Sequence, residues 1–222
     1  MRKLTLAAAM AAAGTAQAAP PVPPAPRYEV PVLSDFEIGA TLADGEEVEN
    51  RVDGDFNGDG DIDTAWISRG NDKRALHVQF AVRGEFDFYH DPAGDVELDP
   101  FPLGPAEMSV SKGVLVVKDL TGGTTAVSAT YRYRGEKTKP KMRLIGLDAT
   151  LYSRTWAHDG AEMSWNVLTG DVIATKLTLV GSGENANYDK SAVKGFKRPV
   201  KPLYMEDTPS AEDTLDLAMK GK

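Results

Sequence analysis

The sequence contains no cysteine. This absence excludes disulfide bonds, thiolate zinc sites, a cysteine nucleophile and the lipidated cysteine of a lipoprotein anchor. Histidine is also scarce: the three residues are His77, His90 and His158, and no pair of them has the spacing of a helical metal site. Packing and oxygen ligands are therefore left to hold the protein together.

Long apolar runs are lacking as well once the N-terminal region is passed. The longest covers residues 113–117, which is the length of a strand and far short of a membrane span. Between residues 34 and 205 no window shows the periodicity of an amphipathic helix. We therefore expect no membrane span and no helical bundle.

The N-terminus has the pattern of a signal peptide over residues 1–18. Arg2 and Lys3 precede an Ala-rich apolar stretch, and Ala16-Gln17-Ala18 fits the small-x-small cleavage motif. An amphipathic first helix is the alternative, but the stretch has no polar face. Residues 19–31 are rich in proline, which favours an extended polyproline leader and forbids a helix. We expect the mature protein to be periplasmic or secreted.

Acidic residues outnumber basic ones, giving a formal net charge of −8. Removal of Arg2 and Lys3 with the signal peptide would make the charge more negative by two. A net-acidic chain is poorly suited to binding the phosphate backbone of nucleic acids. We therefore expect no nucleic-acid partner.

The fold predicted from the pattern of alternating residues is a single all-β domain over residues 32–205, either an antiparallel sandwich or a curled meander. The expected strands cover residues 36–41, 64–68, 75–81, 114–119, 126–134, 142–152, 161–168 and 172–180. Strands 64–68 and 75–81 should form a hairpin, and the four prolines of 90–105 predict a long loop. The acidic tail, 206–222, allows one short helix with Thr208 as its N-cap.

The acidic stretch that follows residue 53 has the spacing of a calcium loop. Counting from Asp55, side-chain oxygens fall at positions one, three, five and nine, and a glycine at position six allows a sharp turn. Calcium takes about six to eight oxygen ligands, and position seven would offer a backbone carbonyl. The predicted metal ligands are Asp55, Asn57, Asp59, Asp61 and Asp63. The alternative is a solvated acidic turn.

The loop is not an EF-hand, because position twelve is Trp66 where that motif needs a bidentate Glu. Asp55-Phe56-Asn57-Gly58-Asp59-Gly60, closed by Asp63, instead resembles the calcium loop of FG-GAP (integrin-like, VCBS-type) repeats. That resemblance implies that Phe56 packs into the core. Short runs at 113–118, 129–133, 144–148, 165–170 and 202–207 are similar to those of small exported bacterial proteins of unassigned activity that carry a single such loop.

No catalytic constellation is visible in the sequence. Gly181-Ser182-Gly183 lacks the flanking pattern of a nucleophile elbow. We expect a calcium-binding, non-enzymatic protein with a structural or interaction role in the cell envelope or outside the cell, its partner an envelope protein or a glycan. The alternative is a calcium-dependent carbohydrate-binding module or a small periplasmic hydrolase with a structural calcium. That alternative rests on an aromatic platform built from Tyr131, Tyr133, Tyr152, Trp156 and Trp165.

Overall fold

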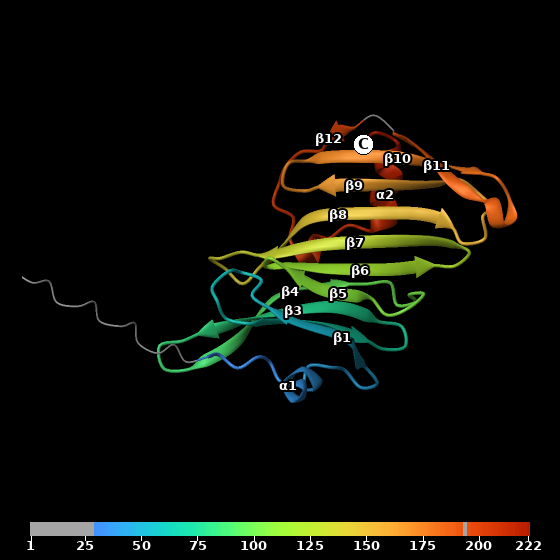
Figure 1. Ribbon diagram of the computed structural model, residues 1–222. Helices are drawn as coiled ribbons and strands as arrows, with labels where there is room; N and C mark the ends of the chain where they lie inside the picture. The colour runs from blue at the N-terminus through green and yellow to red at the C-terminus, as the bar shows by residue number, and fades with distance from the viewer. Residues whose placement is uncertain (1–28, 193–194) are drawn as a thin grey trace, which may run out of the picture.

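A computed structural model describes residues 29–192 and 195–222. The predicted signal peptide and most of the Pro-rich leader lie outside the described residues. The described chain is mostly strand and forms two antiparallel sheets (Figure 1). The predicted all-β antiparallel fold is therefore confirmed. No helix in these ranges is both long and apolar enough to cross a bilayer.

The first sheet contains four strands in chain order: β1 (Glu47–Gly54), β2 (Asp63–Arg69), β3 (Arg74–Arg83) and β4 (Phe88–Glu97). β2 and β3 form the predicted hairpin, closed by a hydrogen bond from the Gly70 N–H to the Lys73 carbonyl oxygen (2.8 Å). β2 is buried on both faces: Ala65 and Ile67 enter the main core, whereas Trp66 packs on the opposite side. This central strand begins directly after the predicted calcium loop.

The second sheet is a long meander, with strand order β11-β10-β9-β8-β7-β6-β5 and a short β12 that also pairs with β10. Its strands are β5 (Glu107–Ser111), β6 (Val114–Gly122), β7 (Thr125–Gly135), β8 (Met142–Ser153), β9 (Gly160–Asn166), β10 (Asp171–Val180), β11 (Asn187–Ala192) and β12 (Phe196–Lys197). The register of β7 against β8 shifts beside Gly146, where the sequence predicts a bulge. Tight turns join most neighbours, so strands adjacent in sequence are adjacent in space.

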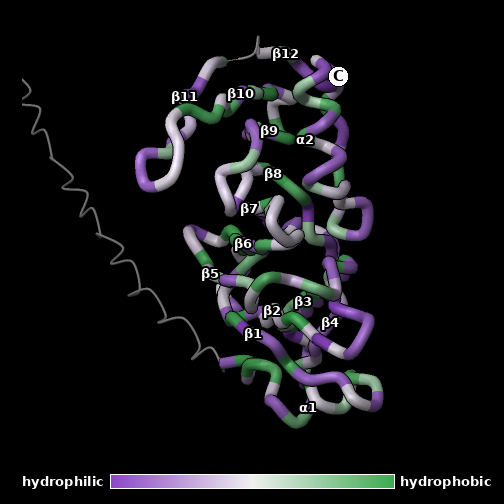
Figure 2. Tube along the Cα trace, turned by 90° about the vertical axis from the view of Figure 1, so that its right-hand side faces the viewer, coloured by the Kyte–Doolittle hydropathy of each residue, from purple (hydrophilic) through white to green (hydrophobic). Residues whose placement is uncertain are grey.

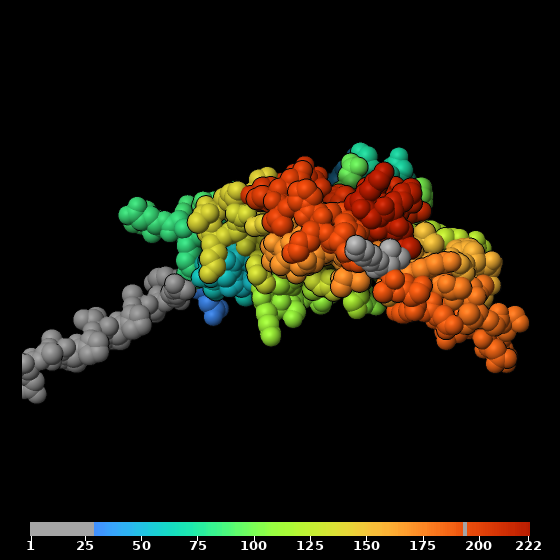
Figure 3. All heavy atoms as spheres, turned by 90° about the horizontal axis from the view of Figure 1, so that it is seen from above, coloured from blue at the N-terminus to red at the C-terminus, as the bar shows by residue number. Residues whose placement is uncertain are grey.

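Two main hydrophobic clusters stabilise the described chain. The larger lies between the first sheet and strands β6–β8. The second lies between the second sheet and the helix α2 (Ala211–Met219), which inserts Ala211, Leu215 and Ala218. Figure 2 shows α2 along one side of the second sheet, and Figure 3 shows the C-terminal segment, in red, packed on the flank of the orange strands. Burial of each large aliphatic side chain contributes about 1.5–3 kcal/mol.

The strand predicted over residues 36–41 is wrong, because this segment begins with the short helix α1 (Asp35–Gly39). Ser34 and Glu37 form a capping box. The Glu37 N–H donates to Ser34 Oγ (3.3 Å), and the Ser34 N–H donates to Glu37 Oε2 (2.8 Å). These bonds satisfy N–H groups that a strand would have left for pairing.

The long loop predicted over residues 90–105 is also wrong in its first half, which belongs to β4. Pro92 is tolerated because β4 is an edge strand and the register shifts at this point. The sequence pattern also missed β1, a partly exposed strand with little apolar alternation.

The C-terminal helix exists but starts later than predicted. Its N-cap is Ser210, whose Oγ accepts from the Asp213 N–H (3.3 Å). Thr208, the predicted cap, instead forms a hydrogen bond with the Tyr133 hydroxyl (3.1 Å). Tertiary contact with β7 therefore sets the path of the chain into the helix.

Candidate metal centre

The predicted calcium loop connects β1 to β2 and turns tightly at two glycines. Gly58 (φ 79°) and Gly60 (φ 92°) adopt left-handed conformations that other residues reach only at a cost. Both glycine N–H groups donate to the carboxylate of Asp55, from Gly58 to Oδ1 (2.6 Å) and from Gly60 to Oδ2 (3.0 Å). The first predicted ligand is thereby placed at the inside of the turn.

The next two predicted ligands, Asn57 and Asp59, also direct oxygens toward the loop backbone. Asn57 Oδ1 accepts from the Asp59 N–H (2.9 Å), and Asp59 Oδ1 accepts from the Asp61 N–H (2.8 Å). The Asn57 amide donates to Asp59 Oδ2 (3.0 Å). Asn57 is buried and Asp59 is exposed, so one edge of the loop remains accessible to solvent.

Asp63, the closing ligand, is fully buried at the start of β2, with 0% of its surface exposed. Its carboxylate accepts from the N–H of Phe56 (2.7 Å) and from the N–H of Ala81 in β3 (3.0 Å). Burial, together with the charges of Asp59 and Asp55, raises the pKa of Asp63 to about 7, although these two hydrogen bonds act to lower it. Among the described residues no salt bridge forms to Asp63. The Asp63 carboxylate is therefore buried within the influence of two other acidic side chains.

Asp61 was predicted to contribute its backbone carbonyl. Its side chain is paired with Arg83 at the end of β3, where Nε donates to Oδ2 (2.7 Å) and Nη2 donates to Oδ1. This forked ion pair occupies the carboxylate, so only the carbonyl oxygen would be left for an ion. The hydrogen bond and the opposite charge of Asp61 raise the pKa of Arg83.

Phe56 anchors the loop in the main core, with 1% of its surface exposed. The Phe56 carbonyl oxygen accepts from the N–H of Gly135 at the end of β7 (2.9 Å). A side chain on Gly135 would collide with Phe80 and with the Phe56 carbonyl, at 2.6 and 2.9 Å. The close approach of β7 therefore fixes the loop against the second sheet.

The predicted ligands are oxygen donors, but the structure does not bring their carboxylates into one cluster. Within residues 29–192 and 195–222, no three His, Cys, Asp or Glu side chains are grouped to hold a metal ion. An ionised carboxylate has about four lone-pair sites. The carboxylates of Asp55, Asp59 and Asp63 each accept two of the hydrogen bonds described above, which leaves oxygen capacity on all three. The donor set is entirely oxygen, as a hard cation such as calcium prefers.

Sequence reasoning missed the residues outside the loop that hold it. Arg83 and the Ala81 N–H lie about twenty residues after their partners. The only signal for them was the predicted β2–β3 hairpin, which pairs Thr64 with Gln79 and so carries the end of β3 back toward the loop.

The aromatic residues considered for a sugar platform do not form an exposed row. Tyr133 is 1% exposed, and Tyr131 and Trp165 pack against the core clusters. Trp156 is 44% exposed, and its ring packs on Tyr188 at a centroid distance of 5.2 Å. Tyr152 is partly buried as well, so these five side chains do not form the exposed row that the predicted platform requires.

The histidines are occupied by local contacts. His77 Nε2 lies 3.0 Å from Ser68 Oγ, and its ring stacks on Trp66 at 5.2 Å. His90 and His158 interact with Pro31 and Thr125 respectively. Comparison with family models, with curated proteins and with solved structures finds no significant match to this chain.

Proposed function

We propose that this is a calcium-binding exported protein without enzymatic activity, with a structural or interaction role in the cell envelope or outside the cell. The observation that carries the proposal is the buried Asp63 carboxylate, which closes a tight loop of inward-facing Asp and Asn oxygens. The charges of Asp55 and Asp59 act on the buried Asp63 carboxylate, and a bound divalent cation would offset this repulsion.

The residues proposed to hold the ion are the side chains of Asp55, Asn57, Asp59 and Asp63, with the backbone carbonyl of Asp61. The FG-GAP-like spacing in the sequence supports this set, and the positive φ angles at the two loop glycines support the tight turn that it needs. The Asp61–Arg83 pair and the two backbone bonds to Asp63 would keep the loop in place when no ion is bound.

A structural role follows from where the loop is attached. Asp63 bonds to β3, and Phe56 bonds to the end of β7 in the second sheet. An ion that rigidifies the loop would therefore stabilise the junction between the two sheets. The exported location, which rests on the N-terminal pattern, supplies an environment where a weak site with Kd of about 10⁻⁴–10⁻³ M would be filled.

The proposal is tested by calorimetric titration of calcium into chelator-stripped protein that lacks residues 1–18, with magnesium as the competing ion. We expect saturable calcium binding at one site, at least about tenfold weaker in Asp59→Ala. Asp72→Ala is the matched control, because Asp72 is an exposed carboxylate in the β2–β3 turn of the same sheet. Absence of saturable binding, or equal binding by Asp59→Ala, would refute the calcium site.

A further inference from the structure

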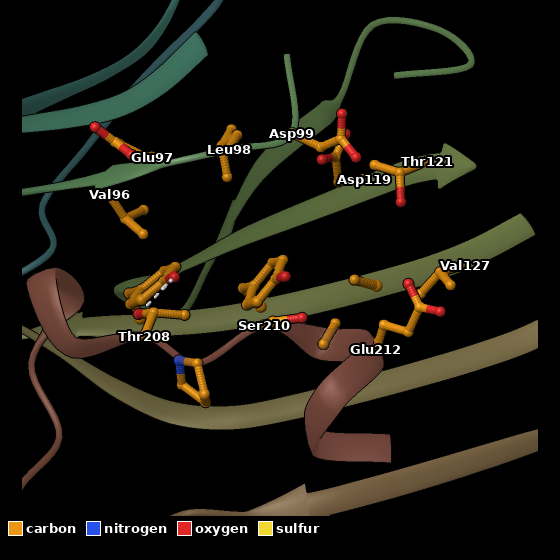
Figure 4. Close-up of a pocket in the computed structure, with 15 residues that line it drawn as sticks. Val96, Glu97, Leu98, Asp99, Asp119, Thr121, Val127, Thr208, Ser210 and Glu212 are labelled. Atoms are coloured by element: carbon orange, nitrogen blue, oxygen red, sulfur yellow. Dashed lines mark hydrogen bonds between the residues drawn. The ribbon is translucent and has the colours of Figure 1, made fainter. Parts of the chain in front are cut away.

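A second feature of the protein is a cavity of about 280 Å³ where the first sheet, the second sheet and the start of α2 meet (Figure 4). Its walls come from the end of β4, from β6 and β7, and from residues 208–212. It shares no lining residue with the calcium loop. The volume is close to the lower end of the range for small-molecule pockets.

One part of the cavity is aromatic and apolar. The rings of Tyr131 and Tyr133 stack with their centroids 6.3 Å apart and an interplanar angle of 14°. Val96 and Leu98 of the β4 segment line the cavity on the side of the first sheet. The Tyr133 hydroxyl is engaged by Thr208, which fixes the ring. Preorganised ring faces of this kind attract cations as well as apolar groups.

The other part is anionic. Figure 4 shows Asp99, Asp119 and Thr121 gathered at one end of the cavity. Both oxygens of Asp119, which is 6% exposed, accept from the buried Arg74 (3.0 Å each), and Arg74 Nη1 also donates to the Asp99 carbonyl (3.3 Å). One guanidinium therefore holds both acidic residues in position. Burial and the Asp119 charge raise the pKa of Tyr131 to about 12. The Tyr131 hydroxyl therefore lies close enough to Asp119 to be affected by its negative charge.

Only part of the negative charge of the lining is compensated by the protein, because Arg74 pairs with Asp119 alone among the acidic lining residues. No lysine, arginine or histidine lines the cavity, and Glu97, Asp99 and Glu212 form no ion pair with any described residue. The start of α2 contributes about half a positive charge from its dipole, which is smaller than the full charge of Glu212 in its first turn. Thr121 also lines the cavity, and its hydroxyl oxygen can accept a hydrogen bond.

We propose that this cavity binds a small amphipathic amine, that is, an organic cation with an ammonium group and an apolar body. The apolar body packs against Tyr131, Tyr133 and Leu98. The ammonium group points to Asp99, Asp119 and Glu212, where charge-assisted hydrogen bonds to carboxylates and to Thr121 satisfy its three N–H donors. An anionic ligand of the same size is rejected by the same carboxylates.

The test uses 2-phenylethylamine as the probe and 2-phenylethanol, its neutral isostere, as the ligand control, with two-dimensional NMR on the protein lacking residues 1–18. We expect saturable shifts of amides in β7 and at the start of α2 with the amine, with a Kd of roughly 1 mM or tighter. Added salt should weaken the binding of the amine and leave the binding of the alcohol unchanged.

Variants locate the charge that recognises the amine. Asp99→Asn combined with Glu212→Gln should weaken binding at least about tenfold. Asp213→Asn, which removes an exposed carboxylate of the same helical turn outside the cavity, should leave binding unchanged. Asp99 also accepts from the Phe101 N–H (2.8 Å). The loss of this bond could make the double variant less stable. Glu212→Gln alone removes no such bond and therefore serves as the second test.

Equal affinity for the amine and the alcohol would overturn the proposal, as would full retention of amine binding by the double variant. Loss of binding in Asp213→Asn to the same extent would also overturn it, because the effect would then be general surface charge. Asp59→Ala should bind the amine normally with or without calcium, so failure of the calcium site and failure of this cavity are separate outcomes.

Discussion

Replacement of Asp63 by Asn should change the stability of the protein in opposite directions under different conditions. Asp63 is fully buried, and its pKa rises from an ordinary value of 3.8 to about 7 on folding. A carboxyl group whose pKa is raised binds its proton more tightly in the folded state. The contribution of Asp63 to the stability of the wild-type protein should therefore fall as the pH rises from about 4 to about 7.

The magnitude follows from two opposing effects of Asp63→Asn. At pH 8 the variant removes a buried charge whose cost is at most about 4 kcal/mol. It also leaves one of the two backbone donors, Phe56 or Ala81, without its acceptor, which costs about 1–3 kcal/mol. With chelator present, the variant should thus be more stable than the wild type by about 1–3 kcal/mol at pH 8. At pH 5 only the lost acceptor remains, and the variant should be the less stable protein.

Calcium should shift the difference in stability at pH 8 toward the wild type. An ion present at about one hundred times its Kd stabilises the folded state by about 2.7 kcal/mol. The wild type should gain this amount, and Asp63→Asn should gain less, because a neutral amide oxygen replaces a charged carboxylate at the ion. The difference between the two proteins therefore moves against the variant when chelator is replaced by calcium.

The assay is urea unfolding followed by tryptophan fluorescence at pH 5 and pH 8, each with chelator and with calcium. The chain has three tryptophans to report the transition. Asp72→Asn serves as the control and should track the wild type in all four conditions. If Asp63→Asn is destabilised by the same amount in every condition, neither charge burial nor ion binding governs this position.

Two further predictions concern buried charge away from the loop. Arg74 has no exposed side-chain surface and bridges Glu49 and Asp119. Arg74→Met should therefore lower the free energy of unfolding, measured in urea, by about 3–5 kcal/mol, because two buried carboxylates lose their partner. Adding Glu49→Gln and Asp119→Asn to this variant should restore part of the loss. A loss below about 1 kcal/mol would contradict a role in joining the sheets. Burial lowers the pKa of His77, so the contribution of this residue to stability should fall as the pH drops below about 6.5. The melting temperature of His77→Gln should therefore rise relative to that of the wild type between pH 7 and pH 5; a constant difference between the two proteins would exclude this effect of His77.

Local signals in the sequence predicted much of the fold. The hairpin that follows the acidic loop, and the meander from β6 to β10, come from alternating side chains bounded by turn residues. The same alternation wrongly predicted a strand at residues 36–41. Phe36 is 86% exposed there, and the Ser34–Glu37 capping box starts a helix instead. Pro92 contributed to the wrong prediction of a loop at this position, because an edge strand with a register shift can contain a proline.

Contacts between distant segments were beyond any pattern in the sequence. Glu49, Arg74 and Asp119 come from three strands and meet only when the two sheets pack. The cavity likewise combines β4, β7 and the start of α2. Sequence spacing cannot foresee such groupings, since residues far apart along the chain are brought together by the packing of whole elements.

The predicted calcium loop shows most clearly which features the sequence determines and which the tertiary structure decides. The sequence by itself determined the oxygen spacing, the glycines at the turn and the apolar Phe56 within the loop, because these depend on neighbouring residues and on backbone conformation. Only the tertiary structure decided that Asp63 is fully buried, that Asp61 pairs with Arg83 and that Phe56 is held by Gly135. Burial and the charges around a carboxylate depend on which strands pack against it, and that is set by the assembly of both sheets.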